Sequence, residues 1–358
     1  MKKLGGKWIF VLSVLIFCGI FNGAAWNSRS FADFYTDRIF PFLTSGYGWF
    51  TSLFPFSVGE FMLVLGVVLF LLLIITLIFR RFFLWKIMPV IISIVLLIMS
   101  LNCFVLYHCS PMVVAQNTKQ EYDLKDLEKL RDYLVEKCND LSSQVPRDEK
   151  GNVVYAGDMA QKAKKAMLGI SDRQKRLGGF YVTPKSLLFS GFMSQQYMQG
   201  YYFPFSMEAN INDLMYIMNK PFTMCHELAH THGYIYEDEA NFLGFLACIK
   251  SEDKVFEYSG YLGVLNYVNN DYYKAVDRDT YNAHVKINET VKYDDQFLTE
   301  EAWEIVDKRS IFDTDLVKNA ADTFIDTNLK VNGVSSGKVS YTPVVTLLLD
   351  YYNDNSYN

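Results

Sequence analysis

The chain has 358 residues, of which 51% are hydrophobic and only 20% are charged. This composition is more apolar and less charged than that of an ordinary globular domain, and most of the apolar excess lies in the first third of the sequence. The formal net charge of −5 gives no basic field to hold a phosphate backbone, so we expect no nucleic-acid partner.

Three apolar stretches in the first third are long enough to cross a bilayer. They run from about Trp8 to Trp26, from about Phe61 to Phe79 and from about Ile87 to Tyr107, and each supplies about the 20 residues that a spanning helix needs. A cleavable signal peptide is the alternative for the first stretch, but the two apolar stretches downstream favour a multi-span anchor. The sequence therefore predicts a membrane anchor over residues 1–108, in contact with the lipid bilayer, and a separate domain over residues 109–358.

Cations beside these stretches predict their orientation. One group precedes the first stretch and the other separates the second from the third: Lys2, Lys3, Lys7, Arg80, Arg81 and Lys86. The positive-inside rule places both groups in the cytoplasm, so we expect a multi-pass cell-membrane protein with a cytoplasmic amino terminus and an extracytoplasmic domain. The intervening residues 27–59 become an external loop, whose many aromatic side chains favour the outer membrane–water boundary.

The domain contains helical patterns and four of the six cysteines. Leucines at helical spacing predict a helix from Asp123 to Asp140. A basic segment from Ala156 to Leu177 predicts a second helix, with either a solvated face or a face that contacts anionic headgroups. An external domain permits disulfides, and Cys225 with Cys248 is the favoured pair, with buried free thiols as the alternative.

The residues with the clearest chemistry lie in the segment FTMCHELAHTHG, in which His226, Glu227 and His230 form the pattern HExxH. Residues four apart share one helix face, so both imidazoles can reach one Zn²⁺ ion at roughly 2.0–2.1 Å. Glu227 can instead act as the general base of peptide hydrolysis. Thr223 is a candidate N-cap for this helix and Gly233 a candidate stop. The motif predicts a zinc-dependent enzyme with a peptide or protein substrate.

A catalytic zinc site requires a third protein ligand. Gly233 stands where the metzincin pattern HExxHxxGxxH has its glycine, but that pattern then requires a histidine where this chain has Tyr236. His232 is poorly placed, because two residues along a helix it points away from His230. An acidic ligand on a second helix, as in gluzincins, is the better scheme, and Glu237–Glu239 opens such a helix.

The sequence Glu-Ala-Asn at 239–241 resembles the third-ligand segment of the ImmA-type metallopeptidases. This resemblance implies that Glu239 is the third zinc ligand. Glu237 and Asp238 then have the alternative role of acids that stabilise the amino end of a helix.

Further pieces of the chain match one family over nearly its whole length: PFSVGE (55–60), FPFSMEANIN (203–212), PFTMCHELAHTHG (221–233), EDEANFLGFLAC (237–248), YSGYL (258–262) and SYTPVVTLLLDYY (340–352). They resemble a family of bacterial membrane proteins known as domain of unknown function 3810. The resemblance implies a zinc peptidase-like protein with an HExxH core and no assigned substrate. His232 and Thr342 depart from the expected pattern, and neither is an expected ligand.

Residues 203–212 precede the motif helix, where zincins place a strand that pairs with an extended substrate; a purely structural strand or loop is the alternative. Glu208 in this segment is expected to be structural or to support the site from outside the ligand set. A donor to the developing oxyanion is also required, and its candidates are Tyr258, Tyr261, Tyr341, His232 and His284.

The sequence thus predicts an α+β, helix-rich zincin-like domain that follows three transmembrane helices. The expected function is membrane-anchored zinc-dependent peptide hydrolysis, with His226, His230 and Glu239 as ligands and Glu227 as general base. A non-catalytic zinc-binding membrane sensor or scaffold is the alternative, and Glu227 counts against it because a structural zinc needs no general base.

Overall fold

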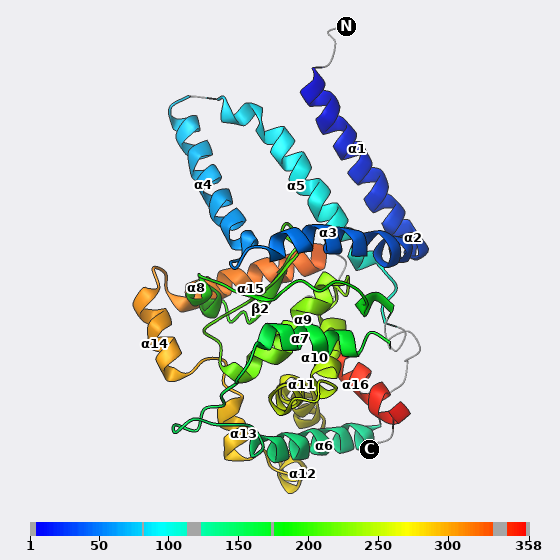
Figure 1. The fold of residues 1–358 in the computed structure, drawn as a ribbon, viewed down its shortest axis with the longest axis vertical. Helices are drawn as coiled ribbons and strands as arrows, with labels where there is room; N and C mark the ends of the chain where they lie inside the picture. The colour runs from blue at the N-terminus through cyan, green and yellow to red at the C-terminus, as the bar shows by residue number, and fades with distance from the viewer. Residues whose placement is uncertain (1–4, 81, 113–122, 173–174, 332–341, 356–358) are drawn as a thin grey trace.

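The computed structural model describes residues 5–80, 82–112, 123–172, 175–331 and 342–355. This part of the chain is helix-rich with one small sheet, and three long apolar helices project from one side of a helical domain (Figure 1). The elements of the domain that are not introduced below are α7 (Met159–Gly169), α8 (Ser190–Gln195), α12 (Arg278–Ala283), α13 (Glu289–Asp294), α14 (Glu300–Arg309), α15 (Thr314–Val331) and α16 (Thr342–Asn355).

The three apolar helices are α1 (Gly6–Asn27), α4 (Val58–Ile78) and α5 (Met88–Asn102), the last extended to His108 by a 3₁₀ turn. Each is long and apolar enough to cross a membrane, which confirms the three predicted stretches to within a few residues. α1 and α5 pack against each other, whereas α4 diverges from α5 toward the domain (Figure 1).

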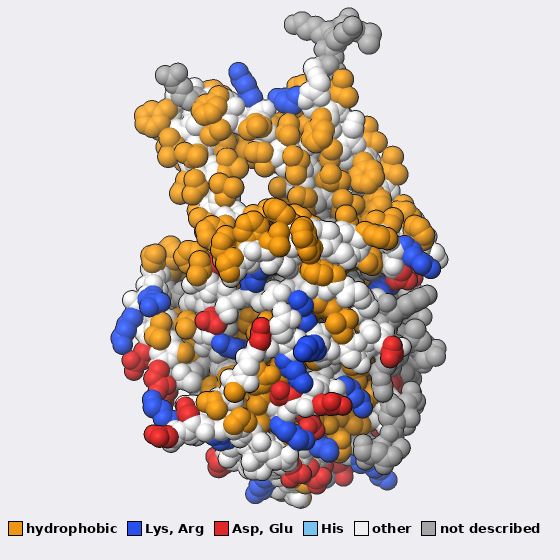
Figure 2. All heavy atoms as spheres, viewed as in Figure 1, with side chains coloured by type: hydrophobic (Ala, Val, Ile, Leu, Met, Phe, Trp, Pro, Cys, Tyr) orange, Lys and Arg blue, Asp and Glu red, His pale blue; other side chains and the backbone are white. Residues whose placement is uncertain are grey.

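The cations between these helices gather at the end away from the domain. The Lys7 ammonium donates a hydrogen bond to the Lys86 carbonyl oxygen at 2.7 Å, which joins the starts of α1 and α5. Lys2, Lys3 and Arg81 lie outside the described residues. Hydrophobic side chains cover the projecting helices and the band beneath them, while charged side chains concentrate on the domain (Figure 2).

The segment between the first two apolar helices is helical rather than a loop. It forms α2 (Arg29–Phe34), a π-helical turn (Tyr35–Ile39) and α3 (Phe40–Ser52), which lie across the base of the apolar helices (Figure 1). Its other face is fixed to the domain, since the Thr44 hydroxyl donates to the Thr231 carbonyl at 3.0 Å. Residues 29–52 therefore form the junction between the apolar helices and the domain.

The core of the domain is a stack of helices. α9 (Lys220–Thr231), α10 (Glu237–Ile249) and α11 (Lys254–Ala275) pack on one another, and α6 (Leu124–Ser142) packs on the far side of α11. Gly244 allows α9 and α10 to approach closely, since a Cβ at this position would lie only 3.2 Å from the backbone nitrogen of His226. This close approach brings the start of α10 beside the motif helix.

Two helices expected from the sequence lie in this domain. α6 is confirmed, and the Asp123 carboxylate caps it by accepting from the Lys125 amide at 3.0 Å. The basic helix is shorter than expected, because α7 starts after Asp158, which caps it, and ends at Gly169. Packing of α9 on α10 brings Cys225 and Cys248 together as free, buried thiols whose sulfurs are 3.9 Å apart.

A three-stranded sheet lies between the helical core and the apolar helices. β2 (Gly200–Phe203) and β3 (Glu208–Ile211) form an antiparallel hairpin, and β1 (Lys185–Ser186) pairs with β3 in parallel, giving the order β1-β3-β2. In the described residues β2 pairs on one side only, so its other edge is free. The tip of the hairpin rises between the bases of α4 and α5 (Figure 1).

Two buried carboxylates join α4 to the sheet and to the segment before α8. Glu208 of β3 accepts a hydrogen bond from the Gly59 amide in the first turn of α4 at 2.7 Å and forms an ion pair of 2.5 Å with Lys185. In return, Glu60 of α4 accepts from the Phe189 amide at 2.6 Å. An anion at the amino end of a helix is favourable, so the Glu208 carboxylate stabilises the start of α4. This agrees with the structural role that was one of the two alternatives expected for Glu208 from the sequence.

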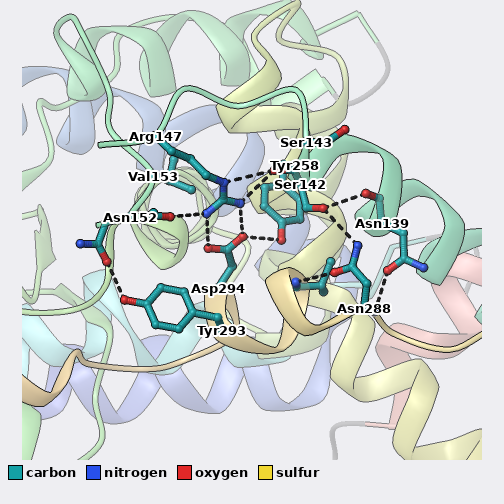
Figure 3. A network of polar contacts seen from close by, with 12 residues as sticks. Asn139, Ser142, Ser143, Arg147, Asn152, Val153, Tyr258, Asn288, Tyr293 and Asp294 are labelled. Atoms are coloured by element: carbon teal, nitrogen blue, oxygen red, sulfur yellow. Dashed lines mark hydrogen bonds and ion pairs between the residues drawn. The ribbon is translucent and has the colours of Figure 1, made fainter. Parts of the chain in front are cut away.

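A separate network of polar contacts (Figure 3) lies around α13, on the side of the domain away from the apolar helices (Figure 1). The fully buried Asp294 carboxylate accepts from the Arg147 guanidinium at 2.5 and 3.0 Å and from the Tyr258 hydroxyl at 2.8 Å. Arg147 also donates to the carbonyl oxygens of Ser142 and Gly151. These bonds hold α6, α11 and α13 together.

Candidate metal centre

The two motif histidines project from one face of α9. Their Nε2 atoms lie 3.0 Å apart, as the four-residue spacing predicts. The helix starts earlier than expected, with Pro221 in its first turn, so Thr223 lies inside it and is no N-cap. Gly233 follows the helix with φ +85°, the left-handed conformation typical of a helix stop.

Glu237, the first residue of α10, completes a group of three candidate ligands. Its Oε2 lies 3.2 Å from Nε2 of His226, and its Oε1 lies 3.7 Å from Nε2 of His230. One donor atom from each of the three residues lies within 4.8 Å of the others. Two imidazole nitrogens and one carboxylate form a donor set suited to a catalytic zinc ion, which keeps a further position open.

Glu239 lies elsewhere, and this corrects the ligand expected from the sequence. Its carboxylate is only 4% exposed and accepts a hydrogen bond from the Met112 amide at 2.6 Å. Residues two apart on a helix point in widely different directions, so α10 cannot direct both Glu237 and Glu239 at the imidazoles. The carboxylate beside the histidines belongs to Glu237, which was expected from the sequence only to stabilise the amino end of α10.

Hydrogen bonds at the Nδ1 atoms select the tautomer of each imidazole. Nδ1 of His230 lies 2.7 Å from the Tyr234 carbonyl oxygen, and Nδ1 of His226 lies 2.9 Å from Oδ1 of Asn241. Both oxygens act as acceptors, so a neutral imidazole carries its proton on Nδ1 and turns an unprotonated Nε2 toward the centre. Two lone pairs that face each other at 3.0 Å suit a cation between them, and the residues therefore fit a metal ion.

Glu227 lies next to this group and is only 3% exposed. Among the described residues its Oε2 has no hydrogen-bond partner, although buried acceptors are ordinarily paired. Burial raises the pKa of Glu227 to about 8, against the opposing effect of His226. A Cβ at Gly200 would lie 2.8 Å from Oε1 of Glu227, so β2 must carry glycine where it passes the carboxylate.

A cleft of about 610 Å³ is lined by the two histidines, Glu227, Glu237 and Asn241. Thr223 and Glu227 of α9, Glu237 of α10 and Gly200 of β2 line it. Substrate-sized clefts that hold a few convergent polar groups are the usual place of an active site. Gly200, Tyr201 and Tyr202 of β2 line one wall of the cleft. The segment 203–212 mainly contains β3, the inner strand of the sheet, which agrees with its structural alternative, so the edge strand beside the candidate site lies earlier in the chain than expected.

The expected oxyanion donors are not among the residues that line the cleft. Tyr258 is bonded to Asp294, His284 to Asp132, and His232 to the Arg176 carbonyl. Tyr261 packs in the core, and Tyr341 lies outside the described residues. The cleft is lined instead by other tyrosines: Tyr107, Tyr197, Tyr201, Tyr202 and Tyr267.

Sequence reasoning missed Glu237, Asn241 and these tyrosines. Asn241 stood in the sequence as the last residue of Glu-Ala-Asn, but its contact with His226 depends on the packing of α10 against α9. No local signal singles out the tyrosines, because the chain contains 24 of them.

The comparison with protein families places this site in a known group. Residues 35–349 match the family described as Protein of unknown function (DUF3810). The chain belongs to the DUF3810 family. The match covers the candidate metal centre, the sheet and two of the apolar helices, and it begins after α1. No curated protein and no solved structure matches the chain. The function of this DUF3810 member is therefore inferred from its own residues.

Proposed function

We propose that this DUF3810 protein is a membrane-anchored zinc metallopeptidase with a zincin-like domain. The observation that carries the proposal is the arrangement of His226, His230 and Glu237 around one point, with the buried carboxylate of Glu227 beside them, whose Oε2 has no hydrogen-bond partner among the described residues. Such a set matches catalytic zinc sites that have three protein ligands. A purely structural zinc ordinarily has four, and the described residues bring three donors together.

Each residue of the site has a distinct role in peptide hydrolysis. His226, His230 and Glu237 would hold Zn²⁺, which supplies Lewis-acid polarisation of water and of the scissile carbonyl. Glu227 accepts the proton of the attacking water and returns it to the leaving amine. Asn241 and the Tyr234 carbonyl orient the two imidazoles through Nδ1, which fixes the direction of both Nε2 lone pairs.

The free edge of β2 provides a place for the substrate backbone. An extended peptide can add to an exposed strand edge through main-chain hydrogen bonds, and this one passes Glu227 at Gly200. Backbone pairing fixes the position of a peptide bond without reading much of its sequence. The geometry thus favours a peptide over a small compact substrate.

The same proposal places the three apolar helices across the membrane, with Lys7 and Lys86 on the cytoplasmic side. The two cations lie at the end away from the domain, which supports an extracytoplasmic domain. α2 and α3 would then lie along the outer leaflet with exposed aromatic side chains such as Phe42 and Trp49 in the interface.

The decisive experiment compares the full-length protein in detergent micelles with its Glu227→Gln variant. We expect about one zinc per chain in both by metal analysis, and hydrolysis of unstructured peptides by the parent alone. Glu301→Gln, at an exposed acid, is the matched control and should keep activity. Full activity in Glu227→Gln would overturn the general-base assignment, and a parent that binds zinc but cleaves nothing would favour a sensor or scaffold.

A further inference from the structure

One end of the cleft is built by a membrane helix. Met99 from the last turn of α5 lines the cleft together with Cys103 and Tyr107, which follow in the same apolar span. The other end holds the candidate metal centre. The cleft thus extends from the membrane anchor to the reactive groups, which an enzyme acting on freely diffusing peptides would not require.

β2 connects these two ends. At its start a Cβ on Gly200 would touch Glu227. At its end Phe203 packs so closely on α4 that a Cβ at Gly59 would lie 2.4 Å from its ring, and the next residue, Pro204, accepts a hydrogen bond at 2.7 Å from Asn102 at the end of α5. A strand rises about 3.3 Å per residue, so β2 covers roughly 10 Å between the site and the helix ends.

The place where β2 ends is open to lipid between the helices. α4 and α5 diverge there, and the hairpin tip lies between their bases (Figure 1). Large apolar side chains of α3 and of the segment around the start of α8 are exposed: Phe42, Trp49, Phe50, Leu188, Phe189 and Phe192. Hydrophobic side chains also form a layer beneath the projecting helices (Figure 2), and we infer that the bilayer surface lies at this level, near the end of β2.

We propose that the substrate is a peptide anchored in the same membrane by an apolar segment. Its extended juxtamembrane part enters between α4 and α5 and pairs along the free edge of β2 until its scissile bond reaches Glu227. The proposal rests on the proposed function and names its substrate class. From the length of β2, about four to six residues should separate the end of the apolar segment from the cleaved bond.

Cleavage tests this with the full-length protein in zinc-containing phosphatidylcholine–phosphatidylglycerol vesicles. One peptide library has a randomised segment after an apolar span of about 20 residues, and the matched library lacks the span. We expect anchored peptides to be cleaved at least about tenfold faster, with cuts clustered about four to six residues from the span. Equal rates, or cuts spread along the segment, would overturn the proposal while hydrolysis itself upheld the proposed function.

A second measurement does not depend on turnover. In the Glu227→Gln protein, a photoreactive amino acid at Met99 should crosslink to the anchored library and not to the library that lacks the span. The same probe at Leu65, an exposed residue of α4 that does not line the cleft, is the control and should give only the background level. Equal crosslinking of both libraries at Met99, or none, would overturn the anchored-substrate assignment. Failure of the parent to cleave either library would instead count against the peptidase itself.

Discussion

Oε2 of Glu237 lies 3.2 Å from Nε2 of His226, so the amino end of α10 meets the middle of α9 at the candidate metal centre. Glu237→Gln should therefore weaken zinc binding by roughly 100-fold or more, because an amide is a far poorer zinc ligand than a carboxylate. Competition with a chromophoric chelator measures the affinity. Glu239→Gln is the matched control and should keep it, since that side chain bonds to the Met112 amide. The reverse ranking would return Glu239 to the ligand set.

The buried ion pair between Lys185 and Glu208 should contribute strongly to the junction of the sheet with α4. Glu208→Gln leaves the Lys185 ammonium buried without a counter-charge, and loss of one partner of such a pair costs about 3–5 kcal/mol. Thermal unfolding in detergent should show a lower midpoint. Glu304→Gln breaks an exposed pair with Lys308 and should leave the midpoint unchanged. Similar shifts in both variants would contradict the structural role of Glu208.

Gly233 should be intolerant of a side chain. Its φ of +85° is strained for alanine, and a Cβ there would lie 2.6 Å from Cγ2 of Thr36. We expect Gly233→Ala to lower the free energy of unfolding by about 1–3 kcal/mol. Gly169 ends α7 with open space around the position of a Cβ, so Gly169→Ala should be neutral or stabilise by up to about 1 kcal/mol. Equal losses in the two variants would rule out this explanation.

The proposed orientation can be tested by labelling engineered thiols in intact cells. A cysteine at Lys150, whose side chain is 76% exposed on the domain, should react with a membrane-impermeant maleimide. A cysteine at the exposed Lys86 beside α5 should react only after the membrane is permeabilised. Labelling of position 86 alone in intact cells would reverse the topology.

Local patterns predicted the parts of the structure that depend on local spacing. Four residues between His226 and His230 were enough to place both imidazoles on one helix face, and apolar length was enough to locate three long helices. The N-cap was misplaced at Thr223 because Pro221 already lies in the first turn of the helix, and the Thr223 hydroxyl bonds to Gln199 instead.

The choice between Glu237 and Glu239 lay beyond local pattern. It depends on how α10 is rotated against α9, which is set by contacts between distant parts of the chain: the Met112 amide binds Glu239, and Gly244 packs on the backbone of His226. The contribution of Met99 to the cleft was hidden for the same reason, since only the tertiary arrangement brings a membrane helix to the motif.

The reactivity of buried cysteines can be used to measure unfolding of this protein. All six cysteines are free and buried, and burial raises the pKa of Cys138 and Cys248 well above that of an exposed thiol, which keeps them in the unreactive protonated form. A thiol-specific dye should therefore react with Cys138 and Cys248, which are fully buried, only as fast as the structure opens. Rates measured without denaturant would then give the stability of the chain inside its own membrane, where calorimetry and denaturant titration are difficult to apply.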